Sequence, residues 1–231
     1  STLFPYTTLF RSLADDVLEI LLQDKTTKKN IIWATDAYQS HGKNCTDTSR
    51  MTREAFSMEK KVVLQPRTEK ALDQQQERTR KKAEVFTSVW LCNKMNNYAD
   101  EEWFGRKDVF NRENDDNSWT VIETKIQFPE GKTWKDYVDS RRLEITCGEA
   151  PYLVSRYDAA TGMFILPPLR RVGILDRKLR IVNENAETRE EWIKWAERAF
   201  QSCYGYEWQG DSLLIDRKST RLNSSHLAES R

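Results

Sequence analysis

Two short segments, each at the end of a predicted strand, constrain the fold of this chain more than any other feature. Residues 144–152 read Glu-Ile-Thr-Cys-Gly-Glu-Ala-Pro-Tyr and close a predicted strand over 141–147. Residues 204–208 read Tyr-Gly-Tyr-Glu-Trp and follow a predicted helix. A small-residue turn lets backbone N–H groups approach a nucleoside ligand, and a carboxylate at the end of the next strand accepts ribose hydroxyls. The pair therefore predicts an α/β fold with a Rossmann-like sheet.

The helix between these strands carries its own start signal. Thr188-Arg-Glu-Glu191 has the spacing of a capping box, in which the first side chain and the last satisfy each other's backbone N–H groups. One face of the helix holds Trp192, Trp195, Ala196, Ala199 and Phe200, which is typical of a core face. Because strand–helix–strand crossovers are right-handed, we expect 141–147 and 204–207 to be neighbouring parallel strands under this helix.

The rest of the chain gives weaker signals. Apolar residues at helical spacing predict a helix over 13–23, and charge spacing predicts a polar helix over 67–83. Alternation predicts a strand over 120–128, after a surface loop over 111–118. The stretch 158–190 shows no clear helix and contains several Gly and Pro residues, so we expect an inserted excursion there.

Composition excludes several classes of protein. The net charge is +1, which gives no bulk basic surface from which to argue nucleic-acid binding. No apolar run reaches membrane-spanning length. The four cysteines are scattered, which predicts reduced and mostly buried thiols in a cytoplasmic protein. With two histidines in the whole chain, a His-based metal site or a Ser-His triad is not expected.

Both ends of the chain read as foreign to the rest. Residues 1–12 (STLFPYTTLFRS) and 216–231 (DRKSTRLNSSHLAESR) resemble translated sequencing-adapter read-through. The tail is polar without an apolar period, which predicts disorder. We therefore take 13–215 as the authentic part and expect it to stop within a domain.

Each candidate residue has an ordinary interpretation beside the functional one. Gly148 permits a tight turn near a ligand, but 144–150 could be a common strand–turn. Cys147 has no His or Lys base near it in the sequence, so a small buried residue is the better interpretation. Phe86 and Thr87 could be a core residue and a helix cap, and Glu207 alone is a weak indicator.

Read together, several segments resemble one family. They are KAEVFT (82–87), WLCNKMNN (90–97), EEWFGRKDVFN (101–111), the stretch 128–158 and YGYEWQGDSLL (204–214). These are similar to the methylation subunits of bacterial restriction–modification systems, which are S-adenosylmethionine-dependent adenine-N6 DNA methyltransferases. The similarity runs through most of 13–215, including KKNIIWATDAY (28–38).

The resemblance implies a set of residues that bind S-adenosylmethionine and no metal. A Phe-Thr-Pro segment, a cofactor loop and a ribose-binding acid map onto the following residues: Phe86, Thr87, Glu144, Thr146, Cys147, Gly148, Ala150 and Glu207. The chain departs from the family pattern at Ser88, where Pro is usual, at Glu144-Ile145, where Asp-Pro is usual, and at Ala150, where Gly is usual.

The resemblance also implies an organisation and partners. A truncated Rossmann-like methyltransferase domain would span 81–215, with an insertion at about 158–190, after a helical and irregular N-terminal region over 13–80. The partners would be double-stranded DNA and a restriction endonuclease, either as a subunit or as a fused nuclease, in the cytoplasm and without a membrane.

One absence bears on activity. Enzymes of this family grip the flipped adenine with an Asn/Asp-Pro-Pro-Tyr/Phe tetrapeptide. The single Pro-Pro here, Pro167-Pro168, lies between leucines that cannot hydrogen-bond the adenine amine. We therefore assign no catalytic residue and expect the chain alone to be inactive. The rival interpretations are a non-catalytic DNA-binding or protein-interaction module with a basic cluster at 78–82, and a small-molecule methyltransferase.

Overall fold

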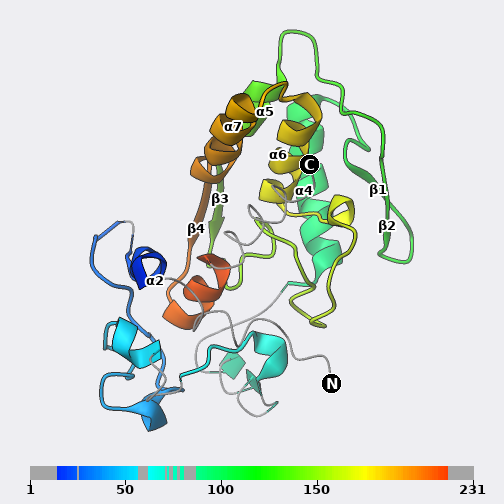
Figure 1. The fold of residues 1–231 in the computed structure, drawn as a ribbon. Helices are drawn as coiled ribbons and strands as arrows, with labels where there is room; N and C mark the ends of the chain where they lie inside the picture. Colours follow the sequence, from blue (N-terminus) through cyan, green and yellow to red (C-terminus); the bar gives the residue numbers. More distant parts are fainter. Residues whose placement is uncertain are drawn as a thin grey trace. The chain divides into compact units, whose positions relative to one another are not determined.

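The computed structural model describes residues 15–24, 26–56, 62–70, 72, 75–76, 79–80 and 87–217. They form two compact units. The first takes its described residues from Ser1–Glu84 and Glu207–Arg221, and the second takes them from Val85–Tyr206. Helices and strands are mixed, with two small sheets (Figure 1). Within the described ranges, no helix has both the length and the apolar character needed to cross a membrane.

The described part of the first unit contains the helix α2 (Asp15–Leu22), three short 3-10 helices and a further α-helical segment over 210–217. The 3-10 helices are η1 (Gln39–His41), η2 (Arg53–Phe56) and η3 (Arg67–Glu69). Its core gathers around the fully buried Trp33, with Leu22, Met51 and Leu214. The predicted helix over 13–23 is confirmed at 15–22. The predicted helix over 67–83 begins as the 3-10 turn η3, and most of its remainder lies outside the described residues.

The helices of the second unit are α4 (Val89–Phe104), α5 (Trp134–Asp139), α6 (Ile174–Asn185) and α7 (Arg189–Gln201), with the 3-10 helix η4 (Pro168–Arg170). Helices α5, α6 and α7 pack against one another. Thr188 caps α7 as predicted, because its side chain accepts the Glu191 N–H at 3.1 Å. The capping box is only half formed, since the Glu191 carboxylate accepts from Glu187 and not from Thr188.

The predicted parallel strand pair is confirmed. Strand β3 (Arg142–Ile145) pairs in parallel with β4 (Cys203–Tyr206), so that Leu143 lies opposite Tyr204 and Ile145 lies opposite Tyr206 (Figure 1). Helix α7 leads directly into β4 and contacts it. Its small residues Ala196 and Ala199 are buried, and its large aromatic residues pack partly buried against the same core: Trp192, Trp195 and Phe200.

Two sequence predictions about the middle of the chain are wrong at their edges. Residues 111–113, predicted as loop, form β1 (Asn111–Glu113), which pairs antiparallel with β2 (Trp119–Val121). The predicted strand over 120–128 ends at Val121. The hairpin is polar, and it is held by paired amides: Asn93 and Asn111 each donate to the other, at 3.0 and 2.8 Å. Apolar alternation does not detect a strand that is anchored in this way.

The expectation that 158–190 holds no clear helix is also wrong. Helix α6 occupies 174–185 and packs in the core of the second unit. Its buried face includes Arg177 and Lys178 beside apolar residues. These two basic side chains hide the helical period from a count of apolar residues alone.

Candidate functional site

A pocket of about 680 Å³ runs along β3 within the second unit. It extends from Arg141 before the strand to Gly148 after it, and α4 forms part of its wall. The full lining is Thr87, Met95, Asn96, Ala99, Arg141, Arg142, Leu143, Glu144, Ile145, Thr146, Cys147, Gly148, Pro151, Tyr152, Leu153 and Ile174. The volume falls within the range of about 300–1,000 Å³ that is usual for small-molecule sites.

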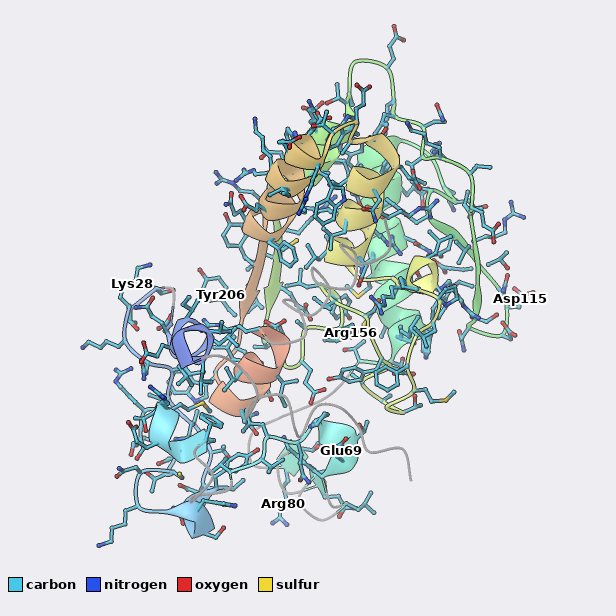
Figure 2. All side chains as sticks on the ribbon, viewed as in Figure 1. Lys28, Glu69, Arg80, Asp115, Arg156 and Tyr206 are labelled. Carbon is cyan, nitrogen blue, oxygen red and sulfur yellow. The ribbon has the colours of Figure 1, made fainter. Side chains whose placement is uncertain are left out.

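Five of the predicted cofactor residues line this pocket: Thr87, Glu144, Thr146, Cys147 and Gly148. Ala150 does not line it, because its side chain is fully buried in the core. Phe86 lies outside the described residues. Glu207 belongs to the first unit, where its Oε1 accepts the Gln209 N–H at 2.9 Å, and it directly follows Tyr206, the last residue of β4 (Figure 2).

The loop after β3 has an unusual backbone. Thr146, Gly148 and Ala150 all lie in the left-handed region, with φ of 54°, 57° and 55°. Glycine adopts this conformation without penalty, whereas each of the other two residues costs about 1–2 kcal/mol. Two hydrogen bonds hold the turn, from Cys147 N–H to the Tyr206 carbonyl at 3.0 Å and from Ala150 N–H to the Cys147 carbonyl at 2.7 Å. Strained residues that a fold retains cluster at functional sites.

Glu144 ties the strand to the segment beyond the loop. It is buried, and its Oε2 accepts the backbone N–H of Leu153 at 3.2 Å. One of its acceptor positions is thus used inside the protein. The assignment of Glu144 to cofactor binding stays a prediction.

Helix α4 supplies a wall that the sequence reasoning did not assign. The Asn96 side-chain amide donates to the carbonyls of Tyr152 and Val172, at 3.0 and 2.9 Å, and so fixes the segment after the loop to α4. The Tyr152 hydroxyl donates to the Met95 thioether at 3.2 Å. Burial raises the pKa of Tyr152, while a hydrogen bond with Thr87 opposes that rise. The sequence carries no signal for this wall, because an Asn is ordinarily counted as a surface residue.

The cysteines behave as predicted. All four are free thiols, and three of them are buried. Cys147 lies in the core beside the pocket. Burial raises the pKa of Cys92 well above the ordinary thiol value and also raises the pKa of Cys203, which favours the protonated thiol in both. These thiols therefore serve as small core residues and not as nucleophiles.

Comparison with models of protein families, with curated proteins and with solved structures gave no match. The geometry alone describes what the pocket can do. It combines an apolar wall with a strained turn at the C-terminal end of a parallel strand, and it places two arginines at the other end. A pocket of this kind suits a ligand with both polar and apolar parts.

Proposed function

We propose that this chain is part of an adenine-N6 DNA methyltransferase of a restriction–modification system, and that the pocket beside β3 binds S-adenosylmethionine. The observation that carries the proposal is the gathering of Thr87 with Glu144 and the 146–148 turn around one pocket. Only Thr87 is distant in the sequence from Glu144 and the 146–148 turn, which are contiguous, and the family resemblance selected all of them without reference to their geometry. The parallel pairing of β3 and β4, joined through α7, supports a Rossmann-like sheet.

The residues present fit the cofactor. The 146–148 turn is held by the Cys147 hydrogen bond to β4, and its backbone would lie close to a ligand bound at the end of the strand. Thr87 and Tyr152 offer hydroxyl groups, and Leu153 and Ile174 offer apolar surface. S-adenosylmethionine supplies an electrophilic methyl group on its sulfonium. The side chains of this pocket would bind and orient it. The resemblance also assigns Phe86 and Glu207 to cofactor binding, although Phe86 lies outside the described residues and Glu207 belongs to the first unit.

The proposal for this chain is cofactor binding and not transfer. The tetrapeptide that would grip adenine is absent from the sequence. Because positioning of the base is most of what this transfer requires, we expect no labelled methyl group to reach duplex DNA when the chain is assayed alone. DNA as the substrate, and a nuclease as subunit or fused domain, belong to the proposed whole enzyme.

Calorimetric titration with S-adenosylmethionine and S-adenosylhomocysteine tests the proposal, and two glycines provide matched variants. Gly148→Ala places a methyl group in the pocket turn, whereas Gly131→Ala does so at φ of 75° in open space outside the pocket. Both changes carry a similar backbone penalty of about 1 kcal/mol. We expect Gly148→Ala to weaken binding about 10-fold, the equivalent of ~1.4 kcal/mol, and Gly131→Ala to leave it within about 2-fold. Absence of binding by the folded chain, or equal losses in both variants, would contradict the proposal.

A further inference from the structure

The stretch 156–171 forms a compact excursion between the loop after β3 and helix α6 (Figure 1). Its first half is a short hairpin, in which Tyr157 pairs antiparallel with Phe164. Gly162 closes the turn at φ of 76°, and its N–H donates to the Asp158 carbonyl at 2.7 Å. The hairpin is thus a defined element of the second unit.

Hydrogen bonds fix both ends of the excursion to the rest of the unit. The hydroxyl oxygen of Ser155, just before the hairpin, accepts the N–H groups of Val172 and Gly173 at 2.6 and 2.8 Å. The Trp119 indole N–H, on strand β2, donates to the Arg170 carbonyl at 2.9 Å. The side chains that the excursion presents are therefore held on a supported backbone.

Positive charge is concentrated on the excursion. It holds three arginines and one acidic residue, whereas the rest of Val85–Tyr206 holds more acidic than basic residues. Arg170 is exposed, and its guanidinium carbon lies 6.0 Å from the ring centre of Trp119, to which its own carbonyl is bonded. An anionic partner would be attracted to this part of the unit more than to any other.

Two of the arginines share one buried carboxylate. Asp176 Oδ2 accepts the Ser155 N–H at 3.0 Å, and its Oδ1 lies 3.9 Å from Nη1 of Arg171. Burial raises the pKa of Asp176, and the charges of Arg171 and Arg156 oppose that rise. Figure 2 marks Arg156, whose Nε and Nη1 atoms have no hydrogen-bond partner among the described residues. One carboxylate balances one guanidinium, so the cluster keeps a positive charge that a phosphate would neutralise.

Large apolar side chains are exposed on the same excursion. Met163 is 71% exposed, Leu166 is 62% exposed and Phe164 is 43% exposed, whereas Ile165 between them is buried. No residue of 156–171 lines the pocket along β3 or pairs with either strand of that sheet. This surface is therefore separate from the sheet edge, where further strands of the proposed domain would add.

We propose that the 156–171 excursion binds duplex DNA, with its arginines at backbone phosphates and with Met163 and Phe164 inserted at a base step in the minor groove. Arginine pairs strongly with phosphate, and apolar wedges of this kind partly unstack base steps. Charged phosphates beside apolar stacked bases match both parts of the surface, whereas an apolar protein segment would leave the arginines without counter-charge. The inference rests on the proposed function for its substrate, and it adds the element of this chain that holds the DNA.

The experiment is fluorescence anisotropy of a fluorescein-labelled duplex titrated with the full chain at several salt concentrations. Arg156→Gln and Arg170→Gln each remove one proposed phosphate contact, and Arg189→Gln at the exposed start of α7 is the matched control. We expect each of the first two to weaken binding at low salt at least about 3-fold and to reduce the slope of log K against log[salt] by about 0.9. The control should change neither quantity. The slope separates a lost phosphate contact from a structural effect.

Met163→Ala tests the apolar contact, and Ile193→Ala is its control, since Ile193 is also exposed but lies on α7. The duplex carries pyrrolocytosine, a cytosine analogue whose fluorescence rises when it is unstacked. We expect Met163→Ala to weaken binding at least about 3-fold and to reduce the rise in fluorescence, because apolar contact is lost. Its salt slope should be unchanged, because no phosphate contact is lost. Ile193→Ala should behave like the parent chain.

Four outcomes would overturn the proposal. They are no duplex binding by the folded chain, an unchanged salt slope in both arginine variants, unchanged binding and fluorescence in Met163→Ala, and tighter binding of polyglutamate than of duplex with the same dependence on the arginines. The last outcome would assign the surface to an acidic protein. Duplex binding without S-adenosylmethionine binding would support this inference and contradict the proposed cofactor site. Cofactor binding without duplex binding would do the reverse, so the two failures are distinguishable.

Discussion

Replacement of Asp100 by Asn should cost the second unit about 3–5 kcal/mol of stability, because it leaves a buried guanidinium without a counter-charge. Asp100 on α4 and Arg177 on α6 are both about 1% exposed in their side chains, and their Oδ2 and Nη1 atoms are 2.5 Å apart. Two unit charges about 4 Å apart interact by ~4 kcal/mol at an effective dielectric constant of about 20. The usual cost of breaking a buried ion pair and the Coulomb energy of the two charges therefore agree in magnitude.

The surrounding hydrogen bonds explain why the pair cannot relax. The Tyr137 hydroxyl donates to the second carboxylate oxygen of Asp100 at 2.7 Å. Arg177 Nη2 donates to Asn93 and Asn97 at 2.9 and 2.8 Å. The guanidinium carbon also lies 5.2 Å from the ring centre of Phe110. Because the Arg177 side chain is about 1% exposed and its Nη atoms are held by these partners, water does not reach it to screen the uncompensated charge.

The assay is urea unfolding followed by tryptophan fluorescence, since Trp103 packs against Tyr137 with ring centres 5.1 Å apart. The matched control is Asp108→Asn, which breaks the exposed pair with Arg112 at 2.9 Å and should cost no more than about 1 kcal/mol. The double change Asp100→Leu with Arg177→Met should recover much of the single loss, because it removes both charges. A loss below about 1 kcal/mol for Asp100→Asn, or a double variant as unstable as the sum of its parts, would refute the reasoning.

Three further predictions concern other parts of the chain. Gly210→Ala should destabilise the first unit by about 3 kcal/mol or more in urea unfolding, because a Cβ there would lie 1.9 Å from the backbone carbonyl oxygen of Ile32. A loss under ~1 kcal/mol would contradict this, since it would show that the Ile32 backbone moves away from residue 210 at little cost. Burial lowers the pKa of Lys178 to about 8. The unfolded chain therefore keeps the Lys178 proton to higher pH than the folded chain does. The free energy of unfolding should rise between pH 8 and 9 by up to ~1.4 kcal/mol per pH unit, and at higher pH the raised pKa values of Cys92 and Cys203 should reverse this rise. A slope that persists in Lys178→Met would contradict this. Glu207→Ala should weaken S-adenosylmethionine binding about 10-fold in calorimetry, since charge-assisted hydrogen bonds are worth ~1.5–3 kcal/mol, and an unchanged affinity would remove Glu207 from the site.

Apolar patterning predicted the parts of the fold that are held by apolar contacts. The α7 face, its Thr188 cap and the parallel pairing of β3 with β4 follow from side-chain spacing and the crossover rule. These features are local, or they depend on a chirality that every such crossover shares. The sequence therefore predicts the α7 face, its cap and the β3–β4 pairing without knowledge of distant contacts.

The parts held by buried polar groups could not be predicted in this way. Helix α4 buries Asn93, Asn96 and Asp100, and α6 buries Arg177 and Lys178. Such residues are ordinarily counted as surface, and they become core residues only when their partners on another element are known. The same limit applies to the site, because the α4 wall of the pocket depends on Asn96 bonding to two carbonyls that are distant in the sequence.

The most direct test of the central claim is amide hydrogen exchange with and without S-adenosylmethionine. If the pocket beside β3 binds the cofactor, protection should rise in residues 87–99 and 144–153, which supply most of its lining, and should stay unchanged in the β1–β2 hairpin, which lines none of it. No change in exchange at saturating cofactor, or a change confined to regions outside these two segments, would contradict the account.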